Sequence, residues 1–289
     1  MKRAFLQLHI SILLAGFTGI FGRLITLSEG LLVWYRMVIA SALLFVILKA
    51  SGKFIRLPLK DSIKIALIGF LLSLHWIFFY GSIKAANVSV GVICFSLTGF
   101  FTAIFNPLLT RKRFSWREIL FSIVAVTGIL LIFHFDARYR AGIAIGVVSA
   151  ALAALFMIAN KSVSAGYPLI TLIFYEIAGG LIPMTFLMPL YLRYFNITEY
   201  LPDARNLILL FLFVIFCTII MYMLQISALR QISAFTVNLS YNLEPIYTIV
   251  LAGFIFEEHK YLNGVFYIGF ALIVLSVLLQ MRSITWKSG

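Results

Sequence analysis

The sequence has few charged side chains, and acidic ones are the scarcest. Of its 289 residues 11% are charged, with 10 Asp or Glu against 23 Lys or Arg, and 63% are hydrophobic. Soluble domains carry about 25% charged and about 45–50% apolar residues. A water-soluble fold could not bury this much apolar surface, so the composition indicates an integral membrane protein.

Cysteine and the motifs of catalysis are also scarce. The two cysteines, Cys94 and Cys217, lie inside apolar runs and provide neither a disulfide framework nor the spacing of a metal site. The sequence lacks a glycine-rich phosphate loop, a His-Glu-x-x-His pattern and a nucleophile elbow, which are signatures of ATP use and hydrolysis. We therefore expect no cofactor and no metal.

Long hydrophobic runs dominate what is present. A membrane span needs about 20 apolar residues, and the runs predict ten spans, at 4–22, 31–49, 64–83, 86–108, 117–134, 141–160, 168–190, 207–228, 234–256 and 263–281. Backbone groups in lipid need partners within the segment, and the runs lack the period-two pattern of barrel strands, so the spans should be helices. The run after Lys2 and Arg3 has no small-residue cleavage site and should remain as the first span.

The basic residues predict an orientation. The formal net charge of +13 would suggest nucleic-acid binding in a soluble protein, but the basic residues here lie between apolar runs. One set of alternate loops holds 15 Lys and Arg residues and the other holds 7. Because basic loops stay in the cytoplasm, we expect both termini to be cytoplasmic, in a bacterial inner membrane, with no nucleic-acid partner.

The sequence repeats itself after about half its length. Residues 82–129 align with residues 228–275 at a shift of 146. Arg36 aligns with Glu176 at a shift of 140, because the loop near 192–206 is longer than its counterpart. Each repeat holds five spans, and an odd number turns the second repeat upside down relative to the first.

This repeat predicts the fold. We expect an all-α integral membrane protein of ten transmembrane helices in two inverted five-helix repeats, residues 1–136 and 137–289. Inverted repeats commonly build a carrier whose site lies at the repeat interface, near the middle of the membrane.

Specific residues carry a family resemblance. The second repeat contains Ala228-Leu229-Arg230, Asn242-Leu243-Glu244-Pro245, Glu257-Glu258 and Gly264. This pattern resembles the second repeat of EamA-type carriers of the drug/metabolite transporter superfamily, and the first repeat resembles it more loosely. The first repeat departs from the family pattern at Thr98-Gly99, where a proline is usual, and at Lys112, where a glutamate is usual.

The resemblance implies a secondary transporter rather than an enzyme. We expect spans 1, 3, 4, 6, 8 and 9 to surround a polar cavity that opens to alternate sides, while the resemblance places spans 5 and 10 at the periphery. It also implies a small organic metabolite as substrate, such as an amino acid or related solute, often moved outward. Protons are a candidate coupling ion, and the protein should be a monomer or a homodimer.

Glu244 is the most informative single residue. It lies about ten residues after the start of the ninth span. At a rise of about 1.5 Å per residue this distance places it near the bilayer centre. An ionisable group at that depth costs at least about 2.5 kcal/mol and usually faces a cavity or a partner. At helical spacing Tyr241 shares its side of the helix. Glu244 is therefore either a structural residue beside a kink at Pro245 or a contact for substrate and proton.

Further candidates lie on three other spans. His75 and Trp76 sit near the middle of the third span, and the repeat pairs them with Met221 and Tyr222 in the eighth. His75, Trp76 and Tyr222 are predicted to face a shared cavity, and His75 could accept a transported proton because histidine titrates near neutrality. Thr98 on the fourth span is a further candidate for substrate binding.

Three basic residues allow alternative interpretations. We expect Arg36 to extend toward the membrane surface or to bond carbonyls at a helix end, with a role in gating as the alternative. Lys84 and Arg230 occupy equivalent positions in the two repeats. They could attract an anionic solute at the two mouths or anchor helix ends.

Two other classes of protein stay open at this point. A membrane-embedded enzyme acting on lipid should show clustered His, Asp or Glu side chains. The four histidines, His9, His75, His134 and His259, are scattered over the chain. A non-transporting receptor or scaffold would have its interior filled rather than hollow.

Overall fold

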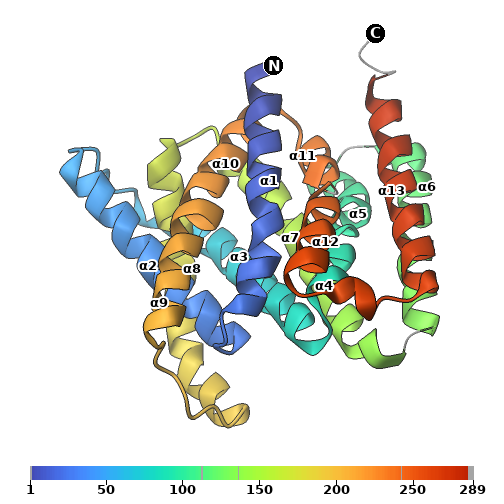
Figure 1. The fold of residues 1–289 in the computed structure, drawn as a ribbon. Helices are drawn as coiled ribbons and strands as arrows, with labels where there is room; N and C mark the ends of the chain where they lie inside the picture. Colours follow the sequence, from blue (N-terminus) through green and yellow to red (C-terminus); the bar gives the residue numbers. More distant parts are fainter. Residues whose placement is uncertain (1, 112, 136, 242, 286–289) are drawn as a thin grey trace.

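The computed structural model describes residues 2–111, 113–135, 137–241 and 243–285, which form helices and short connections (Figure 1). The first half contains α1 (Lys2–Leu24), α2 (Glu29–Ala50), α3 (Leu59–Ala85), α4 (Val88–Phe95), α5 (Thr98–Thr110) and α6 (Trp116–Phe135). The second half contains η1 (Ala137–Tyr139), α7 (Arg140–Val163), α8 (Leu169–Tyr194), α9 (Ala204–Val214), η2 (Ile215–Ile220), α10 (Met221–Gln231), α11 (Ala234–Tyr241), α12 (Glu244–Ile255), η3 (Glu258–Lys260) and α13 (Gly264–Thr285).

Each predicted span coincides with one helix or with consecutive helices. Seven helical segments of the described residues are long and apolar enough to cross a membrane: Lys2–Leu24, Glu29–Ala50, Leu59–Ala85, Val88–Thr110, Ala137–Val163, Leu169–Tyr194 and Ala204–Gln231. The remaining three predicted spans contain shorter apolar helices, Ser122–Ile132, Glu244–Ile255 and Gly264–Ser276. The chain is therefore an all-helical, multi-pass membrane protein, and the number of ten crossings stays a prediction.

Two predicted spans are interrupted in the middle. In the first repeat α4 ends at Phe95 and α5 begins at Thr98, and in the second α11 ends at Tyr241 and α12 begins at Glu244. Thr98 and Glu244 are aligned by the repeat, so the two interruptions are equivalent. Pro245 lies in the first turn of α12. Backbone N–H groups there have no partner within the helix, so proline, which lacks an N–H, costs no helical hydrogen bond at this position. Interrupted helices of this kind often form the sites of transporters.

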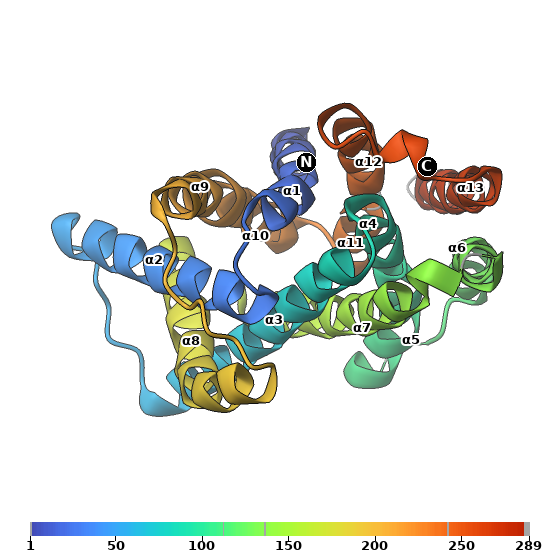
Figure 2. The ribbon, with the colours of Figure 1, turned by 60° about the horizontal axis from the view of Figure 1, so that its bottom comes forward.

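The bundle is organised around α3. Figure 2 shows α3 crossing the middle of the molecule, with α7 and α8 packed against it, while α6 and α13 pair together at one side. The contact of α3 with α8 depends on glycine, since a Cβ at Gly69 would collide with the carbonyl oxygen of Glu176. Small residues bring helices close in membrane proteins, where packing and hydrogen bonds replace the hydrophobic effect between spans.

The start of the first described helix and the end of the last one lie on the same side of the bundle. Helix α1 begins and helix α13 ends at the same end of the molecule (Figure 1), as an even number of crossings requires. Asp136, at which the two repeats are predicted to meet, and Lys112 lie outside the described residues.

Candidate functional site

A cavity lies between the two repeats. Its walls come from α1, α2, α3 and α4 of the first repeat and from α7, α10, α11 and α12 of the second. It is lined by Ala15, Thr18, Arg36, Leu72, His75, Trp76, Phe79, Tyr80, Phe95, Ala153, Phe156, Met157, Met221, Tyr222, Gln225, Asn238, Tyr241 and Glu244. The empty volume is about 610 Å³. Most of the lining side chains are apolar or aromatic and a few are polar, as is usual in small-molecule sites.

Five of the six predicted binding residues lie together in this cavity. They are His75, Trp76, Tyr222, Tyr241 and Glu244. Thr98 is not among the lining residues. It is buried, and its hydroxyl donates to the Phe95 carbonyl across the helix interruption at 2.5 Å. A role in binding stays a prediction for all six.

The Glu244 carboxyl is buried without an ionic partner. The residue is 3% exposed and occupies the N-terminus of α12, where the helix dipole favours negative charge by about 0.3–1 kcal/mol. The Thr18 hydroxyl lies beside the carboxyl, but it also lies 2.7 Å from the Ala15 carbonyl, and a hydroxyl has one proton to donate. Among the described residues the ion pairs that are formed lie elsewhere.

His75 is fixed by a neighbouring helix. Its Nδ1 atom lies 2.9 Å from the Ser149 hydroxyl and 3.1 Å from the Ser149 carbonyl. The Ser149 hydroxyl also lies 3.1 Å from the His75 carbonyl. These contacts join α3 to α7 and hold the imidazole in the cavity wall.

Arg36 is a lining residue whose environment was predicted wrongly. Its side chain is 0% exposed, so it neither extends to the membrane surface nor bonds an ordinary helix end. Its guanidinium donates to the Thr218 hydroxyl at 2.7 Å, to the Tyr80 hydroxyl at 2.8 Å and to the Cys217 carbonyl at 2.9 Å. Cys217 lies in η2, a π-helical turn, and such turns disturb the regular backbone bonding and occur often at functional sites.

A second buried polar cluster was missed in the sequence. The Glu176 carboxylate, which is fully buried, accepts a hydrogen bond from the Tyr222 hydroxyl at 2.5 Å and one from the Asn160 amide at 2.8 Å. The Asn160 amide also donates to the Tyr222 hydroxyl at 2.9 Å. The cluster fixes the Tyr222 ring where it faces the cavity.

The two clusters are equivalent under the repeat. The Arg36 guanidinium lies 3.6 Å from the centre of the Trp76 ring, and the residues aligned with this pair are Glu176 and Tyr222. In each repeat an ionisable residue of the second span therefore contacts an aromatic residue of the third. This equivalence was the signal in the sequence that could have identified Arg36 and Glu176.

The family comparison agrees with this two-part architecture. The family model for the EamA-like transporter family matches residues 2–134 and again residues 140–282. The chain belongs to the EamA-like transporter family. Members of the EamA-like transporter family are membrane transporters, which favours a carrier over a lipid-modifying enzyme or a scaffold and agrees with the resemblance to the drug/metabolite transporter superfamily.

Other comparisons address the fold alone. A solved structure titled only as the crystal structure of a protein matches with a TM-score of 0.68 and 17% identity, over 96% of this chain and 96% of that one. No curated protein matches the sequence. At this identity the likeness shows that the fold of this EamA-like transporter occurs in a solved structure, and it carries no information on substrate.

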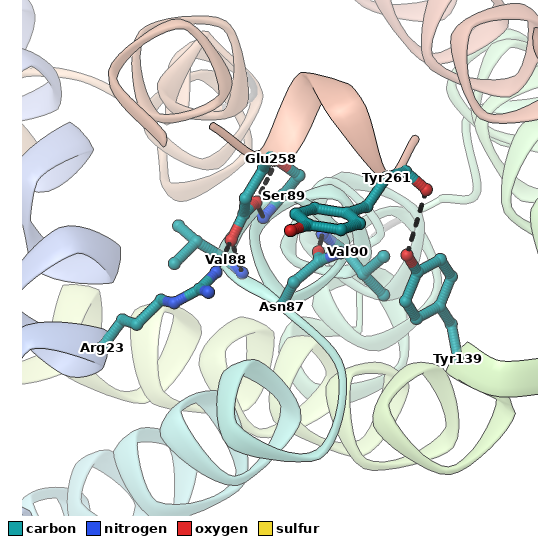
Figure 3. Close-up of polar contacts among 8 residues, drawn as sticks. All are labelled: Arg23, Asn87, Val88, Ser89, Val90, Tyr139, Glu258 and Tyr261. Atoms are coloured by element: carbon teal, nitrogen blue, oxygen red, sulfur yellow. Dashed lines mark hydrogen bonds and ion pairs between the residues drawn. The ribbon is translucent and has the colours of Figure 1, made fainter. Parts of the chain in front are cut away.

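At one end of this EamA-like transporter polar contacts join the two repeats, as Figure 3 shows. The Glu258 carboxylate accepts hydrogen bonds from the backbone N–H groups of Val88 at 3.0 Å and Ser89 at 2.9 Å, and from the Ser89 hydroxyl at 2.6 Å. Arg23, near the end of α1, forms an ion pair with the same carboxylate. We call Glu258 with Val88, Ser89 and Arg23 the Glu258 clamp. It satisfies the free N–H groups at the start of α4, which Asn87 caps further by accepting from Val90 at 2.8 Å.

Lys84 and Arg230 anchor connecting loops. The Lys84 ammonium donates to the carbonyls of Ile25 at 3.2 Å and Leu27 at 2.6 Å, between α1 and α2. The Arg230 guanidinium donates to the Tyr167 carbonyl at 2.6 Å, between α7 and α8. In each repeat the basic residue thus ties the end of the third span to the loop between the first and second spans. Of the two interpretations, anchoring of helix ends is the one that these contacts match.

Proposed function

We propose that this protein carries a small organic solute across the membrane by exposing the central cavity to each side in turn. The observation that supports this most is the equivalence of the cavity walls. Spans 1, 3 and 4 of one repeat face spans 6, 8 and 9 of the other, so a tilt of one repeat against the other would move the opening from one end to the opposite end.

The loop charges suggest the direction in which each end faces. The end that holds the Glu258 clamp belongs to the loops with fewer basic residues, so under this proposal it faces outward and both termini face the cytoplasm. The same assignment takes the ten predicted crossings as its premise, and we propose a bacterial inner membrane as the location.

The Glu258 clamp gives the proposed cycle an asymmetry. Its bonds connect the second repeat to the first, so they must break before the outer end opens. The position aligned with Glu258 is Lys112, and an ammonium group cannot accept bonds from backbone N–H groups. Under this proposal the outer end is held closed more firmly than the cytoplasmic end.

Glu244 and His75 are the candidates for proton coupling within this proposal. Both line the cavity, and both change their charge when they bind a proton. Movement of substrate against a gradient would require such a coupled ion.

Labelling of cysteines in the cavity tests the proposed function without knowledge of the substrate. Ala153→Cys and Val148→Cys are made in a background that carries Cys94→Ala and Cys217→Ala. Ala153 lines the cavity, whereas Val148 on the same helix is 43% exposed on the outer surface of the bundle, where lipid would cover it. A membrane-impermeant thiosulfonate is applied to right-side-out and to inside-out vesicles.

The proposal predicts that Ala153→Cys reacts in both vesicle preparations and that Val148→Cys reacts in neither. Reaction of Ala153→Cys from one side only would contradict alternating access. Lack of reaction from either side would show that the cavity is not a route for solutes.

A further inference from the structure

The cavity holds a carboxyl group that has no ionic partner among the described residues. Among the described lining residues Glu244 is the acidic one. The helix dipole offsets about 0.3–1 kcal/mol, while a buried charge at this depth costs at least about 2.5 kcal/mol. Buried charges are normally paired, so a cation that enters from outside the protein would stabilise the ionised form of Glu244.

The one lining guanidinium cannot be that partner. Arg36 already donates to Thr218, Tyr80 and the Cys217 carbonyl. Its guanidinium carbon also lies 3.6 Å from the centre of the Trp76 ring and 4.4 Å from that of Phe213. The charge of Arg36 is thus held by aromatic and polar groups on its own side of the cavity. For the same reason Arg36 is poorly placed to bind a carboxylate on a solute.

Three further polar groups of the cavity are engaged with the protein. The Tyr241 hydroxyl donates to Ser11 at 3.1 Å, and the Asn238 amide donates to Thr102 at 2.7 Å. The Tyr222 hydroxyl donates to Glu176. An incoming molecule therefore meets Glu244, the acidic group among the described lining residues, together with the amide of Gln225.

Aromatic rings complete the environment. Phe95, Phe156, Tyr222 and Tyr241 line the cavity together with Glu244. Ring faces attract organic cations, and sites for ammonium groups are commonly built from several rings with a carboxylate nearby. The rings also provide apolar surface for the uncharged part of such a molecule.

We propose that the solute is a small organic amine that carries a positive charge and no carboxylate, with its ammonium group held by Glu244 and its apolar part among the rings. This inference rests on the proposed function, since it takes the cavity as the transport site. It narrows the substrate from small organic metabolites in general to monocationic amines.

Four probes that share a phenyl ring isolate the effect of charge. They are 2-phenylethylammonium, neutral 2-phenylethanol, zwitterionic phenylalanine and anionic 3-phenylpropionate. Binding to the purified protein at neutral pH is measured by titration and by thermal stabilisation, since a ligand of the folded state raises its stability. We expect 2-phenylethylammonium to bind at least about tenfold more tightly than the other three, the effect of one charge-assisted hydrogen bond.

Two carboxylate variants locate the effect. Glu244→Gln should abolish the preference for 2-phenylethylammonium over 2-phenylethanol. Glu257→Gln, at an exposed site outside the cavity, should retain it. If Glu244→Gln does not accumulate, the comparison of the four probes on the wild-type protein still decides the matter.

Several results would overturn the inference. Equal affinity for the amine and the alcohol would show that Glu244 does not select charge, and equal or tighter binding of phenylalanine would show a carboxylate site. Stabilisation by Na⁺ or by acid alone, with no probe bound, would identify an inorganic cation or a proton as the partner. The labelling of Ala153→Cys separates this inference from the proposed function. If Ala153→Cys is labelled from both sides, any of these binding results contradicts the amine substrate alone. If Ala153→Cys is not labelled, the proposed function itself is contradicted.

Discussion

Glu258 accepts hydrogen bonds from both the backbone N–H and the hydroxyl of Ser89, although 169 residues separate the two. One residue belongs to the second repeat and the other to the first, so these bonds join the halves that a carrier must move apart. Figure 3 shows the carboxylate between the start of α4 and Arg23. The same contact is therefore a helix cap and, in the proposed transport cycle, a lock between the repeats.

Glu258→Gln is expected to shift the protein toward the outward-open state. An amide keeps the shape of the side chain but loses the ion pair with Arg23 and the charge assistance of the bonds to α4. Hydrogen bonds to charged groups are worth about 1.5–3 kcal/mol each. Since about 1.4 kcal/mol is a factor of ten, the ratio of outward-open to outward-closed protein should rise tenfold or more. The measurement is the rate at which Ala153→Cys is labelled from outside, relative to the rate from the cytoplasm. Glu257→Gln, which removes the exposed pair with Lys260, is the control and should leave the ratio unchanged. An unchanged ratio in Glu258→Gln would show that the clamp is a helix cap only.

Glu176 and Tyr222 should act as one unit. Tyr222→Phe leaves the buried Glu176 carboxylate with one fewer donor, and an unsatisfied buried group costs about 1–3 kcal/mol. Glu176→Gln should cost a similar amount. Because the residues share one hydrogen bond, the double variant should be less destabilised than the sum of the single variants, by about 0.5–3 kcal/mol. A double-mutant cycle of the free energy of unfolding in detergent provides the measurement, and additive effects would contradict the assignment.

Gly69 should be intolerant of any side chain. A Cβ at this position would overlap the carbonyl oxygen of Glu176, whereas a Cβ at Gly81 on the same helix would lie 3.5 Å from the nearest atom of Ile145, an ordinary contact. Gly69→Ala must therefore separate α3 from α8 and displace Glu176, and we expect loss of monodisperse protein or a large fall in melting temperature. Gly81→Ala should behave like the wild type. Equal stability of the two variants would mean that the helices do not approach as closely as the structure indicates.

The hydrophobic runs predicted the helices because backbone N–H and C=O groups in lipid must find hydrogen-bond partners within the protein. Only helices and closed barrels satisfy this requirement. Glu244 and His75 could be predicted as cavity residues because a polar residue in the middle of an apolar run stands out, and both line the cavity. The sequence could not show that Thr98 lies outside the lining, because periodicity does not reveal whether a hydroxyl bonds its own backbone. The Thr98 hydroxyl does so at the Phe95 carbonyl.

The environment of Arg36 could not be derived from local sequence. Its depth in the second span suggested contact with the membrane surface, but its partners Cys217 and Thr218 lie more than 180 residues away. They are available because of a π-helical turn that no residue pattern announced. The repeat alignment alone linked Arg36 with Glu176, and it gave no indication that each would bury its charge against an aromatic side chain.

Tracer exchange across proteoliposomes tests most directly whether solute passes through the cavity. Labelled 2-phenylethylammonium is exchanged at equal concentration inside and outside, with protein-free liposomes as the measure of leak. Exchange is recorded for Ala153→Cys and Val148→Cys before and after treatment with a thiosulfonate. We expect exchange well above the leak in both variants, abolished by the reagent in Ala153→Cys and unaffected in Val148→Cys. Exchange no faster than the leak, or undiminished exchange in fully labelled Ala153→Cys, would contradict transport of an organic cation through this cavity.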